Sequence, residues 1–281
     1  MSTSTKIEWT EVTWNPTTGC DRISPGCDNC YALTLAKRLK AMGQAKYQRD
    51  GDPRTSGPGF GVTVHVDALV EPLRWRRARR VFVNSMSDIG HARVPARFVA
   101  RVFAVMAVSP QHSFQMLTKR PGRLASMLAR EGFRSGMVRP AIEELLVGRP
   151  ELVDRFGRRD QDPFCWPLPN VWVGSSIESD EYCWRADELR RVPAAVRFLS
   201  LEPLLGPLPS LDLTGIDWVI VGGESGPNHR PLDLEWVRDI RDRCVRLRLA
   251  MFFKQVGGVT PKAGGRLLDG RTWDEYPGGA G

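Results

Sequence analysis

The sequence predicts an α/β fold, a (β/α) barrel of the TIM type that is complete or nearly complete and carries a helical insertion. Two patterns support this prediction: short β-rich runs alternate with helix-like stretches, and polar residues collect directly after the runs. About eight such repeats in ~260 residues suffice for a barrel with right-handed crossovers. A doubly wound open sheet is the competing topology. The polar residues favour the barrel, in which the ends of all strands converge on one mouth.

Eight runs rich in β-branched and aromatic residues, each bounded by turns, are predicted to be strands. They span residues 12–15, 62–68, 80–85, 113–118, 170–176, 196–201, 217–223 and 249–255. Helices are predicted at 31–42, 95–108, 122–131, 181–191 and 234–247. In the second of these, Phe98, Val102 and Val105 fall on one face and Arg97 and Arg101 on the other, which is typical of an amphipathic helix.

The barrel is expected to occupy residues 1–256. Residues 133–169 are too long for a simple connection and are predicted to form a helical insertion with a proline-rich exit. The glycine-rich tail, 257–281, is predicted to be irregular, with Trp273 and Tyr276 pinning it to the body.

Composition and charge narrow the class of protein. The chain has 281 residues, of which 42% are hydrophobic, so it can fill a sizeable core. No apolar run approaches the ~18 residues that span a bilayer, and the first residues lack a secretion signal, so we expect a cytoplasmic protein with no membrane partner. The net charge of +8 favours polyanionic partners such as nucleic acid, although an arginine-rich solvated surface explains the same charge.

Three of the six cysteines, Cys20, Cys27 and Cys30, crowd into one loop with the spacing C-x6-C-x2-C. In a reducing compartment such crowding indicates metal binding rather than disulfides. A [4Fe–4S] cluster held by three thiolates leaves one iron open to a further ligand. Structural zinc would need a fourth ligand from a distant cysteine or histidine. The cluster is the favoured interpretation, with zinc and three unligated thiols as the alternatives.

The segment around these cysteines resembles the cluster loop of radical-SAM enzymes. Its flanks, Asn15-Pro16, Thr18-Gly19-Cys20 and Cys30-Tyr31-Ala32, are similar to the N-P-x-x-G-C start and C-Y-A end of the spore photoproduct lyase-like branch. It differs from that pattern in the longer interval between the first two cysteines and in Asn29, which stands where an aromatic residue is common.

Across nearly its whole length the chain also resembles a phage- and bacterium-associated family often called three-Cys-motif proteins. The segments that carry this resemblance are residues 5–10, 83–88, 115–121, 200–207, 222–226 and 252–255. The family name brings little biochemistry with it.

The radical-SAM resemblance implies two cofactors, a [4Fe–4S] cluster on Cys20, Cys27 and Cys30 and S-adenosylmethionine. It also implies an electron donor such as flavodoxin or ferredoxin, and a 5′-deoxyadenosyl radical that abstracts hydrogen from a substrate. The resemblance to a DNA-repair branch, together with the positive charge, makes nucleic acid or a nucleotide the candidate substrate.

Polar residues after the strands are the candidate ligands of S-adenosylmethionine. Lys119 stands where the lyase-like branch has a T-K pair and could bind the cofactor's carboxylate, although such a lysine could instead pair with a neighbouring glutamate. The other candidates are Asn84, Ser85, Ser87, Asp88 and Ser176. Ordinary turn chemistry is the alternative role for the residues at 84–88.

Acidic groups at the ends of apolar strands are candidate substrate contacts, because their ionisation is costly without a partner. The candidates are Glu178, Glu202, Glu224, Ser225 and Lys254. Glu224 belongs to a G-G-E-S-G segment that follows the wrong strand to act as the cofactor-binding glycine-glutamate motif of radical-SAM enzymes. Its spacing also differs from a P-loop or a dinucleotide fingerprint.

Of the histidines, His91 and His229 lie near acidic groups, and no nucleophile elbow accompanies them, which argues against a Ser–His–Asp hydrolase. Most tryptophans are expected to be core or loop anchors, whereas Trp14 and Trp172 could stack on a base. The sequence therefore predicts a radical-SAM-type enzyme whose catalytic residues are unknown. The rivals are a nucleic-acid-binding protein with a structural metal and a non-catalytic adaptor for a partner protein.

Overall fold

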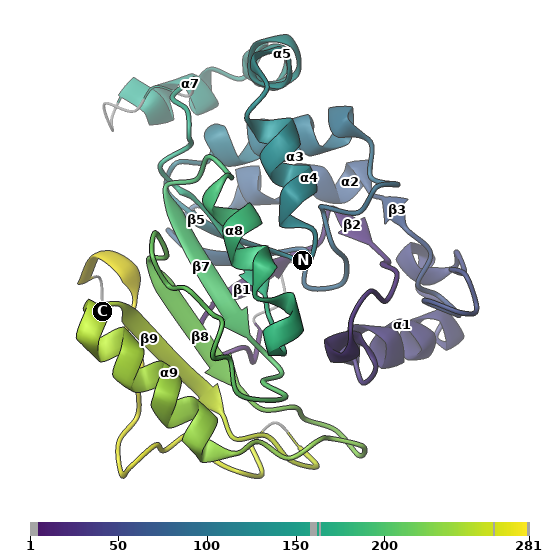
Figure 1. Cartoon of the computed structure of the whole chain (residues 1–281). Helices are drawn as coiled ribbons and strands as arrows, with labels where there is room; N and C mark the ends of the chain where they lie inside the picture. Colours follow the sequence, from purple (N-terminus) through teal and green to yellow (C-terminus); the bar gives the residue numbers. More distant parts are fainter. Residues whose placement is uncertain (1–4, 158–161, 163, 261, 280–281) are drawn as a thin grey trace.

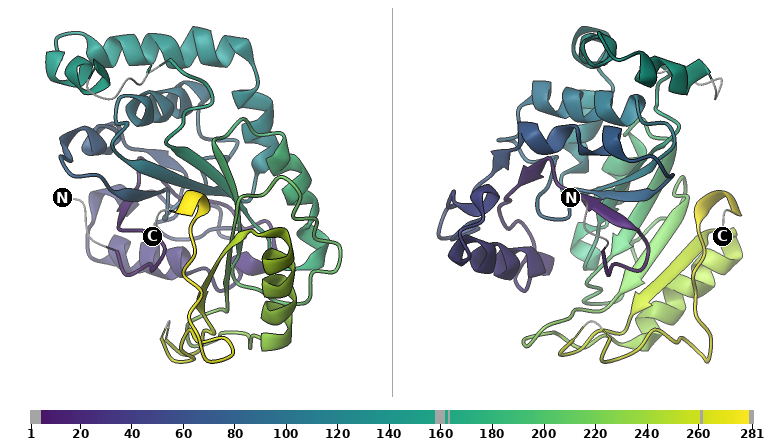
Figure 2. Two further views of the ribbon diagram at one scale, coloured as in Figure 1. Left: turned by 90° about the vertical axis from the view of Figure 1, so that its left-hand side faces the viewer. Right: turned by 180° about the vertical axis from the view of Figure 1, so that it is seen from behind.

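Seven parallel strands form a curled, open half-barrel in a computed structural model of the chain (Figures 1 and 2). The structure describes residues 5–157, 162, 164–260 and 262–279. The strands lie in the order β1-β4-β5-β6-β7-β8-β9. Their bounds are β1 Val12–Trp14, β4 Arg80–Val83, β5 Ser113–Thr118, β6 Val171–Ser176, β7 Val196–Leu201, β8 Trp218–Gly222 and β9 Ala250–Gln255. The predicted α/β class is confirmed, but the sheet does not close into a complete barrel.

The two faces of the sheet differ in what covers them, because successive side chains of a strand point to opposite faces. On the outer face, side chains such as Val83, Phe114 and Val221 are fully buried in the main core beneath the helices. On the inner face, Phe82, Phe198, Trp218 and Phe252 form a second, aromatic cluster together with Trp9. Strands buried on both faces read as continuous apolar runs, which explains why the sequence revealed them.

Four helices cover the outer face of the sheet: α3 Ala96–Ala107, α4 Pro121–Leu128, α8 Trp184–Arg190 and α9 Leu234–Leu247 (Figure 1). In α3 the predicted apolar face is confirmed, since Phe98, Val102 and Val105 are buried. The start of α9 is capped by Asp233, whose carboxylate accepts a hydrogen bond from the backbone of Glu235 at 2.9 Å.

The predicted strand at 62–68 is shorter than expected and does not join the barrel sheet. Its first part, β3 Thr63–Val64, pairs antiparallel with β2 Thr17–Thr18 in a separate two-stranded sheet, and α2 Val66–Leu69 follows directly. Between β1 and β4 the chain also forms α1 Tyr31–Ala41 and η2 Ala45–Tyr47, whose buried side chains share a small separate core with Phe60 and Met86. The barrel therefore has one strand fewer than the sequence pattern predicted.

As predicted, the insertion at 133–169 is helical in its first part, whereas its described residues beyond 157 contain no helix or strand. The helical part follows on from α5 Glu131–Phe133 and consists of the π-helical turn η4 Arg134–Val138, α6 Arg139–Leu146 and α7 Pro150–Gly157. Phe133, Val138 and Ile142 are buried in the same core as α3, so the insertion thickens the outer helical layer. It lies at the opposite side of the molecule from α1 (Figure 1).

The C-terminal tail runs beside the edge strand β9. The backbone N–H of Phe253 donates to the carbonyl of Trp273 at 2.9 Å, and Tyr276 packs on Trp218 with ring centroids 5.2 Å apart. Trp273 and Tyr276 therefore pin the tail to the body as predicted. The remaining short helices are η1 Pro25–Cys27, η3 Glu71–Arg74, η5 Asp180–Tyr182 and η6 Pro277–Gly279. None of the helices in the described part of the chain is long and apolar enough to cross a bilayer.

Candidate functional site

The cysteine loop, residues 19–30, lies across the carboxyl ends of the strands, where the mouth of the half-barrel opens. Gly19 forms a parallel bridge with Ser87, which follows β4. Its φ is +86°, and a Cβ there would stand 2.3 Å from the carbonyl oxygen of Gly61, so this position requires glycine. The bend comes from η1, and Cys30 directly precedes α1. The predicted order of strand, cysteine loop and helix is confirmed.

All six cysteines are described, and all are free thiols. Cys20, Cys27 and Cys30 are half-buried, and Cys27 lies close enough to the other two to raise the pKa of both electrostatically. Burial is the larger cause, and together with the charge of Asp88 it raises the pKa of the Cys20 thiol to about 12. The Nη1 of Arg120 opposes this shift by donating to the Cys20 sulfur at 3.3 Å.

Asp21 anchors the loop beside the first thiol. Its carboxylate accepts hydrogen bonds from Thr55 at 2.8 Å and Ser56 at 3.1 Å, and it pairs with Arg93. Burial alone would raise its pKa, but these partners hold it well below the usual range. His91 Nδ1 accepts from the backbone of Arg93, so His91 Nε2 is the atom that donates to Asp21, at 2.9 Å. The histidine is thus a structural partner of the loop.

A buried ion-pair group centred on Glu178 lies beneath the loop. One carboxylate oxygen accepts from Lys119 Nζ at 2.7 Å and from Arg185 Nη1 at 3.0 Å, and the glutamate has no exposed surface. Burial opposes ionisation, yet the charge of Lys119 and hydrogen bonds from Lys119 and Ser24 hold the pKa of Glu178 below its ordinary value. The other carboxylate oxygen has no partner within the described residues.

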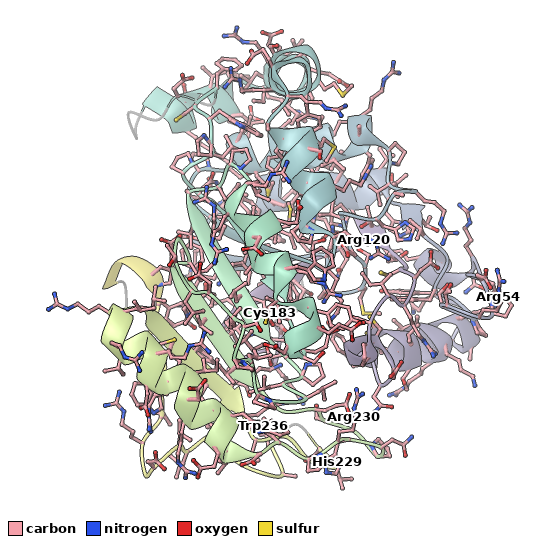
Figure 3. The ribbon with its side chains drawn as sticks, in the orientation of Figure 1. Arg54, Arg120, Cys183, His229, Arg230 and Trp236 are labelled. Carbon is pink, nitrogen blue, oxygen red and sulfur yellow. The ribbon has the colours of Figure 1, made fainter. Side chains whose placement is uncertain are left out.

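Glu224 fastens the far side of the loop. Its carboxylate accepts from Asn29 at 3.0 Å and pairs with Arg230, which also donates to the carbonyl of Pro25 at 3.0 Å. Asn29, which departs from the radical-SAM pattern, therefore serves as a tie between the loop and the segment after β8. Figure 3 shows Arg230 and Arg120 on the same side of the sheet as α1.

A second acid–base pair, Lys254 and Glu202, lies at the same mouth on β9 and after β7. The Lys254 ammonium stands 2.9 Å from the Glu202 carboxylate, and both side chains are mostly buried. Gly222 makes room for this glutamate, because a Cβ there would stand 2.8 Å from its Oε1. Ser200 Oγ adds a long hydrogen bond of 3.3 Å to the same carboxylate.

The donor set of the loop bears on which metal group could bind. In the part of the chain that the structure describes, no three or more His, Cys, Asp or Glu side chains are grouped around a single-ion position. A structural zinc ion needs four close ligands, and among the described residues not even the thiols of Cys20, Cys27 and Cys30 are grouped around one ion position. Arg120 and Lys119 lie beside Cys20 and Cys30, so their charges would offset that of an anionic group held by the loop.

One family model covers almost the whole chain. It is described as "Protein of unknown function (DUF5131)" and matches residues 4–277. The chain belongs to this family. No curated protein matches it.

Among solved structures, this DUF5131 chain is similar to spore photoproduct lyase complexed with dinucleoside spore photoproduct, at 12% identity and a TM-score of 0.42. A double mutant of the same lyase with bound AdoMet and dinucleoside spore photoproduct matches at 13% identity and a TM-score of 0.40. Both matches cover 89% of this chain and 65% of the lyase chain. The DUF5131 chain thus spans about two-thirds of the length of the structures it matches.

The candidate cofactor ligands of the DUF5131 chain come together at the mouth, but several are already engaged. Ser85 exchanges hydrogen bonds with Asn15, and Ser87 with Thr17, so these serines hold the segment after β1. Asp88 is occupied by four donors: Thr118 Oγ1, Gly90 N, Lys119 N and Arg120 Nη1. These contacts of Ser85, Ser87 and Asp88 agree with the alternative role, ordinary turn chemistry.

Asn84 and Ser176 differ from those three. Asn84 is buried at the end of β4 with a φ of +65°, and neither atom of its side-chain amide has a partner within the described residues. Ser176 ends β6, and its carbonyl accepts from Arg185 at 2.9 Å. An unpaired buried amide is rare, which makes Asn84 the strongest candidate of the set.

The tryptophan and histidine candidates make contacts within the fold. Trp14 is fully buried and its indole N–H donates to the carbonyl of Ala68 at 2.8 Å, so the proposed stacking role is wrong. Trp172 packs against Trp218 on the inner face with centroids 5.9 Å apart. His229 contacts the carbonyl of Gly226, and Ser225 accepts a long hydrogen bond of 3.4 Å from Gln255.

Three arginines central to the site were missed from the sequence: Arg120, Arg185 and Arg230. Arg120 had a signal, since it directly follows Lys119 at a strand end. Arg185 lies inside an amphipathic helix and Arg230 in a long loop, where no local pattern marks a buried ion pair.

Proposed function

We propose that this chain is a radical-SAM-type enzyme that holds a [4Fe–4S] cluster on Cys20, Cys27 and Cys30 and modifies or repairs a nucleic acid or nucleotide. The observation that supports the proposal is the placement of three free thiols on one loop across the mouth of a half-barrel, beside cationic side chains. When bound, the cluster and S-adenosylmethionine supply a 5′-deoxyadenosyl radical that removes hydrogen from a substrate.

The chain's own residues would bind and orient the cofactor. Lys119 offers its ammonium to a carboxylate, and Glu178 remains paired with Arg185 if Lys119 turns toward a ligand. The Asn84 amide offers both a donor and an acceptor from the floor of the mouth. Lys254 and Glu202 are proposed substrate contacts, since they form a charged pair at the same mouth.

The proposed setting is the cytoplasm, where thiols stay reduced and an electron donor of the flavodoxin or ferredoxin kind is at hand. The donor surface is proposed to lie near the loop, because Cys20, Cys27 and Cys30 are only half-buried there.

Anaerobic reconstitution with iron and sulfide tests the cluster. We expect a broad visible absorbance with about four irons per chain, lost when Cys20, Cys27 or Cys30 is replaced by Ala. Cys165→Ala is the matched control, because Cys165 is an exposed thiol outside the loop and its loss should change nothing. Zinc as the only bound metal, or iron retained without all three cysteines, would contradict the proposal.

The chemistry is tested separately by incubating the reduced protein with S-adenosylmethionine and measuring 5′-deoxyadenosine. Lys119→Ala should weaken cofactor binding by about tenfold, the loss of one charge-assisted contact. Full cofactor affinity in that variant would remove the role assigned to Lys119. If the cluster forms but no 5′-deoxyadenosine is produced, the result would favour a nucleic-acid-binding protein with a structural metal or a non-catalytic adaptor.

A further inference from the structure

A cavity of about 230 Å³ lies in the outer layer of the fold, away from the cysteine loop. It opens between the end of α4, α5 and the turn that joins α8 to β7. Helices that follow parallel strands run back along the sheet, so the ends of α4 and α8 lie near the amino ends of the strands. The cavity is therefore on the opposite face from the mouth.

The charges around this cavity are unbalanced. Four arginines line it, Arg130, Arg134, Arg191 and Arg197, and Glu131 is the one acidic lining residue. Glu131 is already paired with Arg134, while Arg191 pairs with Glu188 at 3.2 Å. Among the described residues, neither Arg130 nor the guanidinium of Arg197 has a carboxylate partner. Within the described residues, two positive charges at the cavity are thus without a carboxylate partner.

The side chain of Arg197 is held in place. Its Nε and Nη2 donate to the carbonyl of Val192 at 3.2 and 2.9 Å, which leaves Nη1 without a protein acceptor in the described chain. Trp166 also lines the cavity and packs on Phe103 with ring centroids 5.5 Å apart. The cavity therefore combines oriented cationic donors with a supported flat aromatic ring.

Helix ends explain only part of this arrangement. The partial negative charge at the end of a helix favours cations there, which accounts for Arg130 after α4 and Arg191 after α8. It does not account for Arg197, which belongs to β7, or for a cavity between the arginines. A bound anion explains all of these features together.

We propose that this cavity is a phosphate-binding site, in which Arg130 and Arg197 bind the phosphate of a nucleotide unit and Trp166 packs against its sugar or base. Arginine suits this task because its planar guanidinium matches phosphate oxygens, and tryptophan stacks on any base. The volume is below the ~300 Å³ at which drug-sized pockets begin, so the site takes a single phosphate with part of one nucleoside.

The test is titration of the purified full-length chain with inorganic phosphate, with AMP and with a short single-stranded oligonucleotide, at low and high salt. Arg130→Gln should weaken phosphate and AMP binding by about tenfold, because it removes one charge-assisted contact. Arg246→Gln is the matched control: Arg246 is likewise exposed near a helix end and has no carboxylate partner in the described chain. Trp166→Phe should weaken AMP binding but leave inorganic phosphate unaffected.

The ligands distinguish the source of the phosphate. Oligonucleotide binding that is competed by AMP and lost in Arg130→Gln supports a nucleic-acid backbone, and AMP binding alone supports a free nucleotide. Equal weakening by Arg130→Gln and Arg246→Gln, or no binding of any of the three probes, overturns the proposal. Both variants lie far from the thiols, so cluster formation and this site succeed or fail independently.

Discussion

Glu178 is the most heavily constrained ionisable residue at the mouth, since it has no exposed surface and two cationic partners. Glu178→Gln keeps the size of the side chain but leaves Lys119 and Arg185 facing each other without a counter-charge. Removing one partner of a buried ion pair is costly, so the free energy of unfolding should fall by about 3 kcal/mol. Denaturant titration monitored by circular dichroism measures this change.

Glu188→Gln is the control for that substitution. Glu188 is half-buried and pairs at 3.2 Å with Arg191, whose side chain is exposed, and such solvent-accessible pairs contribute at most about 1 kcal/mol. A loss in Glu178→Gln no larger than in this control would show that the buried group adds nothing to stability.

The Glu178 carboxylate also predicts how the stability of the fold changes in acid. The pKa of Glu178 is lowered in the fold from an ordinary value of 4.5, so below pH 4.5 the unfolded chain takes up a proton more readily than the folded chain. Its contribution to stability is therefore present above pH 4.5 and is lost as pH falls through the lowered folded pKa. When the pH is lowered from about 5 to about 3, the free energy of unfolding of Glu178→Gln should therefore fall less than that of the unmodified chain. Parallel curves for the two proteins would refute this role.

At the residue scale, the sequence predicted which polar groups gather but not how they pair. The residues after the strands met at one mouth because parallel strands end at one edge. Lys119 and Glu178 lie 59 positions apart in sequence, so their contact depends on strand order and curl. The unpaired amide of Asn84 likewise depends on three-dimensional packing that no local pattern encodes.

At the scale of elements, the cysteine loop is tied down by contacts that bridge distant segments. Arg230 joins Glu224 to the carbonyl of Pro25, so Arg230→Met should loosen residues 20–30 while the sheet stays folded. We expect faster amide hydrogen exchange in peptides from this loop and unchanged exchange in β5 and β6. Arg238→Met, which breaks a surface pair with Asp269, is the control and should leave the loop unchanged. If amide exchange in the loop of Arg230→Met is slower or unchanged, Arg230 does not hold the loop in place.

The inner face of β6 depends on a glycine. A Cβ at Gly174 would stand 2.5 Å from the ring of Phe198 on β7, so Gly174→Ala must push that ring or the strand aside. Overpacking of this kind should cost about 2 kcal/mol in thermal or denaturant unfolding. At Gly132 in α5 a Cβ would meet nothing within 4 Å, so Gly132→Ala should be neutral or slightly stabilising. Equal effects of the two substitutions would contradict this packing argument.

Sequence periodicity predicted seven strands of the sheet well because each is apolar on both faces. It failed at 62–68, where the alternation of Thr63, Val64 and His65 looks like a sheet strand. In the fold, β3 pairs with β2 instead of a barrel strand, and Thr18 Oγ1 and His65 Nε2 lie 2.8 Å apart beside this pairing. Strand propensity alone does not say which sheet a strand enters.

At the scale of the whole molecule, the half-barrel is open: its edge strands, β1 and β9, do not pair with each other. β1 has only three residues and pairs with β4 alone, while β9 lies at the far edge beside the C-terminal tail. The inner space is filled by aromatic side chains of the strands, by Trp9 before β1 and by Tyr276 of the tail. The sequence repeat indicated β/α units, but closure depends on these terminal segments, which have no periodic pattern.

The tail therefore substitutes for a missing neighbour of β9. Its contacts include the hydrogen bond from Phe253 N to Trp273 O, the bond from the Trp218 indole to Glu275 O at 2.8 Å, and the Trp273 side chain buried in the main core. An uncovered edge strand presents unpaired N–H and C=O groups to other chains. If the tail protects this edge, releasing it should both destabilise the fold and promote association.

Trp273→Ala tests this argument because the indole is only 8% exposed. We expect a loss of about 3 kcal/mol in the free energy of unfolding from the cavity created, together with larger particles in light scattering as β9 becomes available. Trp184→Ala removes a tryptophan that is 51% exposed on α8 and should cost less than about 1 kcal/mol without changing particle size. Destabilisation of Trp273→Ala without association would mean that the tail stabilises the core but that the edge of β9 needs no protection. A stable monomer would contradict both roles, because the open half-barrel would then hold its shape without the tail.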